Sequence, residues 1–195
     1  MAQTRYDELV VMAEAHDGLF TSRQAREEGI EGSVLARLVE RGRLERTSRG
    51  VYRIPYMTPG RFSQHQEAVL WAKAHRGPEA VALSHETALL IYGISDANPS
   101  AIHITVPRGT RFRRAAPKGL LIHFADLAGD EVEVHEGIPI TSVTRTVGDL
   151  LRAGARADLI DQAILEARRE GFAGDAEARR LRRLVKRHFG ALDKT

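Results

Sequence analysis

Residues 19–54 read LFTSRQAREEGIEGSVLARLVERGRLERTSRGVYRI, a run in which helix and turn signals follow one another at short intervals. Thr21 and Gln24 stand in the S/T-x-x-E/Q relation, in which each side chain bonds the other's backbone N–H at the start of a helix. Gly29 can take the left-handed conformation that ends a helix, and Ile30 can fold back onto that helix. The spacing therefore predicts a short helix between Thr21 and Gly29.

A second helix is predicted from Ser33 to just before Gly42. Its apolar residues share one face at spacings of i, i+3 and i+4. They are Leu35, Leu38 and Val39. The opposite, outward row consists of Ser33, Arg37 and Arg41.

Two strand-like runs follow, at residues 44–47 and 51–54, joined by Ser48-Arg49-Gly50. This connection is short enough for a hairpin in which Gly50 accepts a positive φ and Arg49 lies at the tip. Upstream, the apolar spacing from Tyr6 to Ala13 predicts one more helix. Three helices and a hairpin in this order have the layout of a winged helix-turn-helix.

Charge is distributed unevenly over this region. Residues 1–31 contain three Arg and seven acids, a net of −4, whereas residues 32–55 contain six Arg and two Glu, a net of +4. Such a local concentration attracts phosphate, and Arg can also donate two hydrogen bonds to guanine. DNA is therefore the first predicted partner. An ordinary solvated Arg face and a protein-binding winged helix stay open as alternatives, because Arg outnumbers Lys 25 to 4 along the chain.

The composition sets limits on the rest of the chain. At 195 residues and 43% hydrophobic content, it is long and apolar enough for one large or two small folded domains. The absence of cysteine excludes disulfides, zinc-thiolate sites and thiol nucleophiles. There is no run of about 18 apolar residues and the N-terminus is acidic early, so we expect neither a membrane span nor a signal peptide. A cytoplasmic location follows as an expectation.

Pro55 to Gly60 is rich in turn formers and predicts a boundary, with a winged helix-turn-helix over residues 1–56 and a second domain over 60–195. Helices are predicted in the second domain near 63–75, with an S-x-x-Q start at Ser63 and Gln66, and near 84–92. Strands follow at 102–106, 120–125, 132–137 and 138–141, and helices at about 142–153, 157–170 and 175–189. This order predicts an α+β domain with a small antiparallel or mixed sheet and terminal helices.

Two further basic stretches lie in the second half. Five cations and no acid occupy residues 108–119, namely Arg108, Arg111, Arg113, Arg114 and Lys118. The last predicted helix carries an apolar stripe of Ala178, Leu181, Leu184, Val185 and Phe189, with basic residues around the remaining faces. The stretch at 108–119 fits a solvated loop or one that binds a phosphate backbone or an acidic partner. The basic face of the last helix fits a solvated surface, a second nucleic-acid surface or a toxin-docking surface.

We find no catalytic constellation in the sequence. The eight histidines have no H-x-H, H-x-x-x-H or H-E-x-x-H spacing, and G-x-S-x-G, P-loop and G-x-G-x-x-G motifs are missing. His103 and His123 could face each other across neighbouring strands, but two histidines without a third ligand favour a polar strand face over a metal site. The sequence therefore predicts no catalytic residue, no metal and no cofactor.

Three segments of the second half carry a family resemblance. They are SHETALLIYG at 84–93, HITVPRG at 103–109 and GIPITSVTRTVGDL at 137–150. Together with the N-terminal segment, which ends in Gly50-Val-Tyr, they resemble the AbiEi antitoxins of bacterial abortive-infection and toxin-antitoxin systems. The resemblance covers roughly residues 5–155. The tail from Asp158 lacks the acidic cluster of longer, nuclease-like relatives, which favours a short, non-enzymatic form.

The resemblance implies an N-terminal domain that binds an inverted repeat upstream of its own operon and represses transcription. It also implies a C-terminal domain that counteracts a nucleotidyltransferase toxin. The candidate DNA contacts are Arg23, Ser33, Arg37, Arg41, Arg46 and Arg49, and the cations of 108–118 are candidates for the antitoxin function or for added DNA contact. The alternative is a module that does not bind DNA and neutralises the toxin by direct contact.

Overall fold

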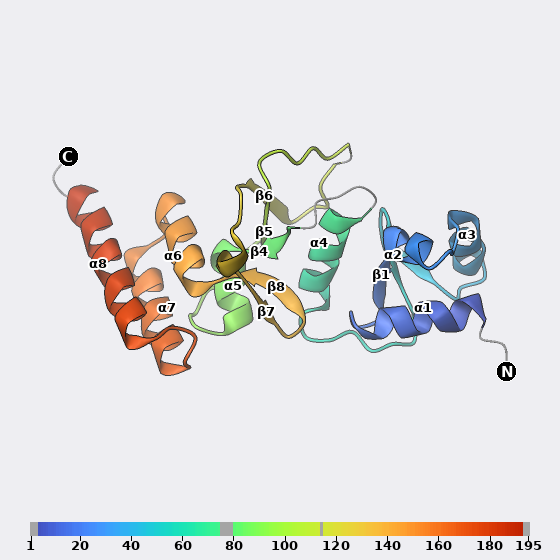
Figure 1. Ribbon diagram of the computed structural model, residues 1–195, viewed down its shortest axis with the longest axis horizontal. Helices are drawn as coiled ribbons and strands as arrows, with labels where there is room; N and C mark the ends of the chain where they lie inside the picture. Colours follow the sequence, from blue (N-terminus) through green and yellow to red (C-terminus); the bar gives the residue numbers. More distant parts are fainter. Residues whose placement is uncertain (1–3, 75–79, 114, 193–195) are drawn as a thin grey trace. The chain divides into compact units, whose positions relative to one another are not determined.

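The computed structural model describes residues 4–74, 80–113 and 115–192, which form two compact units (Figure 1). Unit 1 comprises residues 1–81 and 109–118, and unit 2 comprises residues 82–108 and 119–195. The predicted α+β fold, with helices and a small sheet first and a second sheet with helices after it, is confirmed. Among the described residues, no helix combines the length and apolar character needed to cross a membrane.

Unit 1 begins with three helices and a three-stranded antiparallel sheet of order β1-β3-β2. The elements are α1 (Arg5–Glu14), β1 (Leu19–Thr21), α2 (Ser22–Glu27), α3 (Gly32–Glu40), β2 (Glu45–Ser48), β3 (Val51–Arg53) and α4 (Ser63–Lys73). The order α1-β1-α2-α3-β2-β3 has the layout of a winged helix-turn-helix. The sequence predicted each of these elements except β1, whose three residues are all buried and show no alternation.

The predicted capping of α2 is present in the structure, whereas that of α4 is not. Thr21 and Gln24 form the expected reciprocal capping box of α2. The S-x-x-Q start of α4 is wrong, because Phe62 is the residue before the helix and no side chain caps it. Ser63 and Gln66 instead join α4 to earlier segments. The Ser63 hydroxyl accepts a hydrogen bond of 3.0 Å from Arg53.

Gln66 makes the second hydrogen bond between α4 and the earlier segments, from its amide to His16 Nδ1 at 2.6 Å. The predicted end of α4 at His75 and the following Gly77-Pro78 lie outside the described residues. Because both polar side chains of its first turns bond to residues of the winged-helix segment, α4 belongs to unit 1.

Unit 2 holds a mixed five-stranded sheet of order β6-β5-β4-β8-β7. Its elements are β4 (Ala82–Leu83), α5 (His85–Tyr92), β5 (Ile102–Val106), β6 (Leu120–Phe124), the 3₁₀ turn η1 (Gly129–Glu131), β7 (Val132–His135), β8 (Ile138–Thr141), α6 (Val143–Arg152), α7 (Ala157–Arg169) and α8 (Asp175–Leu192). β5 pairs in parallel with β6, and β4 in parallel with β8, whereas the other two pairings are antiparallel.

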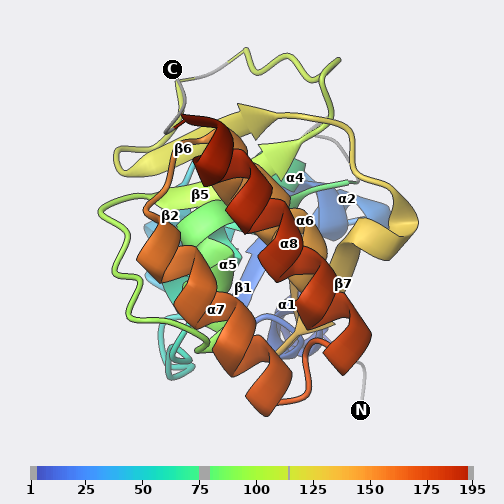
Figure 2. The same ribbon diagram turned by 90° about the vertical axis from the view of Figure 1, so that its left-hand side faces the viewer.

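The terminal helices of unit 2 pack on one another, and Figure 2 shows α7 and α8 side by side. Most of the predicted apolar stripe of α8 is buried, with Ala178, Leu181 and Val185 at 1–4% exposure. Leu184 departs from the prediction, since 37% of it is exposed. The stripe is therefore narrower than its sequence spacing indicated.

β5 is covered on both faces, although the alternation of Ile102, Ile104 and Val106 with His103 and Thr105 predicts a strand with one buried face. Ile104 and Val106 are fully buried on one side, yet Thr105 on the other side is only 1% exposed. α5 packs against β5, and the Thr105 hydroxyl bonds to Ser84, the residue before α5. The polar residues of β5 therefore lie beneath a helix.

Candidate nucleic-acid interface

α3 presents the outward row that the sequence predicted. Leu35 is fully buried, while Val34, Leu38 and Val39 pack partly buried against the same core. The opposite side bears Ser33, Arg37 and Arg41, all exposed. Ser33 and Arg37 lie one above the other because they are four residues apart in the helix, and Arg41, the residue directly after α3, continues this polar row.

The core beneath α3 fixes the position of this row. It contains Leu9, Ala13, Phe20, Ala25, Ile30, Leu35, Leu44 and Ile54, each at most 2% exposed. Between α2 and α3, Gly29 has φ +72° and the N–H of Ile30 donates to the carbonyl of Ala25 at 2.8 Å. This is the predicted glycine-terminated helix end, with Ile30 folded back into the core.

The predicted hairpin after α3 is present, but Ser48 belongs to β2 and not to the connection. Ser48 pairs with Val51, so Arg49 and Gly50 form the two-residue connection, and Gly50 has φ +87°. Arg46 and Arg49 are both exposed. The pairing of β2 with β3 shifts between Arg46 and Ser48, and such an irregularity increases local twist. The hairpin thus presents two exposed cations in the same unit as α3.

Arg23 differs from the other candidates in being paired. Its Nε lies 2.9 Å from Glu27 Oε1, one turn along α2, and 35% of its side chain is exposed. A phosphate at this position would have to compete with Glu27 for the guanidinium. Arg23 is therefore a weaker candidate than Arg37 or Arg41.

Sequence reasoning did not single out Arg43, which follows the row in the chain and stacks on an aromatic ring of α1. Its guanidinium lies over the Tyr6 ring, 4.1 Å from the centroid, and Tyr6 donates a hydrogen bond of 2.6 Å to the Tyr56 hydroxyl. In the sequence, only its positive charge pointed to Arg43 as a possible DNA contact. Its stacking depends on contacts between residues far apart in the chain.

The basic stretch at 108–118 is divided between the two units. Gly109–Lys118 belongs to unit 1, where Phe112 packs against Trp71 of α4 with ring centroids 5.0 Å apart. Arg111, Arg113 and Lys118 are exposed beside it, and Arg114 lies outside the described residues. Arg108 belongs to unit 2, where its backbone N–H donates to Asp126 at 3.2 Å. Most of these cations therefore share a unit with α3.

Comparison with known proteins bears on this N-terminal segment. Residues 8–55 match the family model described as "Transcriptional regulator, AbiEi antitoxin". The AbiEi resemblance is confirmed over these residues. The AbiEi segment runs from α1 to just past β3 and contains the whole α3 row and hairpin.

One solved structure, the RV2827C protein from Mycobacterium tuberculosis, is similar over 92% of this chain and 72% of its own, with a TM-score of 0.52 and 14% sequence identity. At 14% identity this likeness shows that the two proteins share a fold. It extends well beyond the AbiEi segment, so the arrangement of the later elements also occurs in another protein. A comparison with curated proteins gave no significant match.

Proposed function

We propose that this protein is an antitoxin that binds the operator of its own operon through the AbiEi segment, represses transcription and counteracts a nucleotidyltransferase toxin. The observation that carries the proposal is the exposed α3 row of Ser33, Arg37 and Arg41, within a segment that matches transcriptional regulators. In this proposal residues 1–56 supply the DNA-binding function and residues 60–195 the antitoxin function.

α3 is suited to the major groove because its inner face is held by a packed core while its outer face is polar and basic. Arg37 and Arg41 would read guanine edges or bind phosphate, and Ser33 would bind a base edge or phosphate. Arg46 and Arg49 would contact the backbone from the hairpin. Arg111, Arg113 and Lys118 would add phosphate contacts.

The test is binding of the full chain to the DNA upstream of its own gene, measured by gel retardation and footprinting. Arg37→Ala/Arg41→Ala should weaken binding by at least 100-fold. The loss of each arginine that contacts phosphate should also make the plot of log K against log salt less steep, by about 0.9 in slope. Circular dichroism should be unchanged, because both side chains are exposed.

A matched control is Arg179→Ala/Arg183→Ala on α8, which removes two exposed arginines with the same i, i+4 spacing. This variant should keep the affinity and salt dependence of the unaltered protein. Equal binding by the Arg37→Ala/Arg41→Ala variant and the unaltered protein would refute the assignment of α3.

A second candidate function is direct docking of the toxin. It is favoured by the outer face of α8, where Arg179, Arg180, Arg182, Arg183, Lys186 and Arg187 are all exposed. Such a face would attract an acidic protein surface. Co-purification with the toxin, lost on Arg179→Ala/Arg183→Ala, together with no retardation of operator DNA, would assign this function in place of operator binding.

A further inference from the structure

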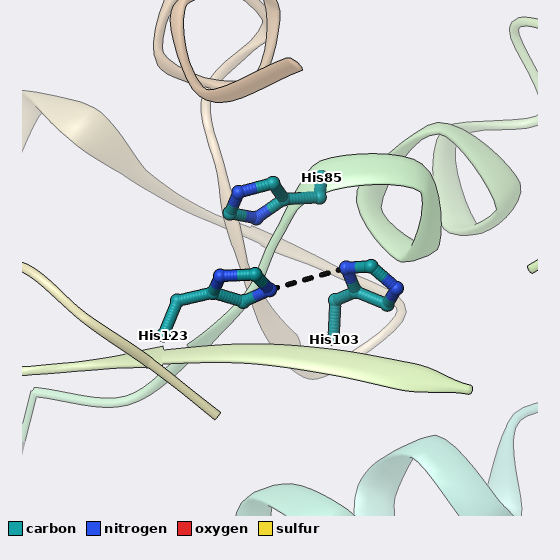
Figure 3. A group of neighbouring side chains, drawn as sticks. All are labelled: His85, His103 and His123. Carbon is teal, nitrogen blue, oxygen red and sulfur yellow. Dashed lines mark hydrogen bonds between the residues drawn. The ribbon is translucent and has the colours of Figure 1, made fainter. Parts of the chain in front are cut away.

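Three histidines converge in unit 2, from three successive elements of the chain. His85 is the first residue of α5, His103 lies on β5 and His123 on β6. One ring nitrogen from each lies within 4.8 Å of those of the other two. Figure 3 shows the rings gathered above the strands, with His123 Nε2 and His103 Nδ1 at 3.2 Å. Sequence reasoning anticipated the facing pair on β5 and β6 and missed His85.

The backbone holds two of these residues in a fixed relation. Ser84, immediately before α5, donates its N–H to the carbonyl of His103 at 3.0 Å. The N–H of His103 in turn donates to Thr87 Oγ1 at 2.9 Å. Both the carbonyl and the N–H of His103 are thus bonded to the start of α5. His123 comes from the adjacent parallel strand, where it pairs with Thr105.

His85 has an unusual backbone conformation, with φ +54°. A non-glycine residue rarely adopts this left-handed conformation, and such residues concentrate at functional sites. In this conformation the His85 ring stacks on His123 with centroids 3.7 Å apart, and the residue is only 7% exposed. The backbone therefore carries local strain at the position that completes the cluster.

A hydrogen-bonded chain orients the His85 ring. His85 Nδ1 lies 3.0 Å from the Ser84 hydroxyl, which accepts a hydrogen bond of 2.8 Å from Thr105 Oγ1. Because Nδ1 is engaged, Nε2 is the His85 nitrogen that is available to a ligand. Metal-binding histidines commonly have their second nitrogen held in this way.

The geometry points to a binding site for a divalent transition-metal ion, and we propose that His85, His103 and His123 bind one ion of the Zn²⁺ class with a fourth position open to water or a small ligand. Imidazole nitrogens suit zinc, nickel and copper, and three histidines with an open position form a known class of zinc site. The proposal is independent of operator binding.

The distances are compatible with such an ion. Zn–N bonds of about 2.1 Å in a tetrahedral site require ring nitrogens about 3.4 Å apart. The His103–His123 pair, at 3.2 Å, is already at that separation. The remaining gaps, of 4.8 Å or less, must close by side-chain rotation that also turns the His85 ring off the face of His123, because an imidazole binds a metal in its own ring plane. Asp149 of α6, 5% exposed, lies near His85 and His123, and its carboxylate is also paired with Arg145 and Arg152.

The test is titration of the metal-free full chain with Zn²⁺ by calorimetry, with metal content after dialysis measured by mass spectrometry. We expect one ion per chain. His123→Ala and His103→Ala should each weaken Zn²⁺ binding by at least 100-fold. Thr105→Val should weaken it by about 10-fold, because it removes the hydrogen bond to Ser84 that helps to orient His85. Bound Co²⁺ should give the visible absorption bands of a tetrahedral site, and these bands should be lost in His123→Ala.

His135→Ala is the matched control, because this half-buried histidine lies on β7 of the same unit and outside the cluster. It should bind Zn²⁺ as the unaltered protein does. If His123→Ala does not fold by circular dichroism, His123→Asn retains a polar side chain and should show the same loss. No Zn²⁺ binding by the unaltered protein, or equal binding by folded His103 and His123 variants, would overturn the proposal.

Discussion

A largely buried polar network in unit 2 centres on Arg145, and the removal of Arg145 gives a quantitative test of the fold. Arg145 Nε donates to both carboxylate oxygens of Asp149 at 3.0 and 3.1 Å. Its Nη1 donates to Glu131 at 2.8 Å and to the carbonyl of Asp126 at 3.0 Å. The side chains of Arg145 and Asp149 are only 9% and 6% exposed. Arg145 therefore ties α6 to the segment before β7.

Arg145→Ala leaves Asp149 in a buried position without its main partner. Breaking a buried ion pair in this way costs about 3–5 kcal/mol. Arg152 still donates to Asp149 at 2.5 Å, but its side chain is 66% exposed, so we expect the lower end, about 3 kcal/mol. With an m-value of about 2 kcal/mol/M, the urea midpoint should fall by roughly 1.5 M.

The measurement is urea unfolding followed by far-ultraviolet circular dichroism, which reports on the helices of both units. Trp71 lies in unit 1, so its fluorescence follows that unit separately. The control is Arg156→Ala, which removes the exposed ion pair with Asp158 and should leave the midpoint unchanged. A loss below about 1 kcal/mol for Arg145→Ala would refute the reasoning, because it would mean that Asp149 is solvated.

Two more predictions concern unit 1. Gly18→Ala should destabilise it by about 1–3 kcal/mol, because Gly18 has φ +82° and an added Cβ would lie 2.8 Å from Met57 Cβ; an unchanged midpoint in tryptophan-detected urea unfolding would contradict this. Burial, the largest cause, together with Lys73 lowers the pKa of His16 below 6.5, so its neutral form is favoured on folding. Its contribution to stability is complete above pH 6.5 and is lost as the pH falls through the folded pKa, by at most about 1.4 kcal/mol per pH unit. His16→Gln should therefore reduce the pH dependence of the urea midpoint between pH 5 and 7, and an identical dependence would exclude His16 as its source.

The sequence predicted the parts of the fold that depend on local signals. The capping box of Thr21 and Gln24, the positive φ of Gly29 and Gly50 and the apolar face of α3 all follow from neighbours within a few residues. The α3 row could be named for the same reason, since helical periodicity alone decides which side chains point outward.

Long-range contacts decided the rest. β4 has two residues, too few for a periodic pattern, and the parallel pairing of β5 with β6 depends on the path of the long link between them. Ser63 and Gln66 satisfy a capping pattern but bond to Arg53 and His16 instead. His85 joins the histidine cluster through a left-handed backbone conformation that no neighbouring residue signals.

The insertion of residues 109–118 into unit 1 has a consequence for how such a protein can evolve. The chain passes between the units after residues 81, 108 and 118. No single crossover in the gene can therefore exchange one whole unit for that of a relative. A crossover between the codons of Trp71 and Phe112 would take one of these two packed rings from a relative, where the residue can fit its new partner poorly. The two segments of unit 1, residues 1–81 and 109–118, are thus expected to be inherited together with residues 82–108 of unit 2, which lie between them in the chain.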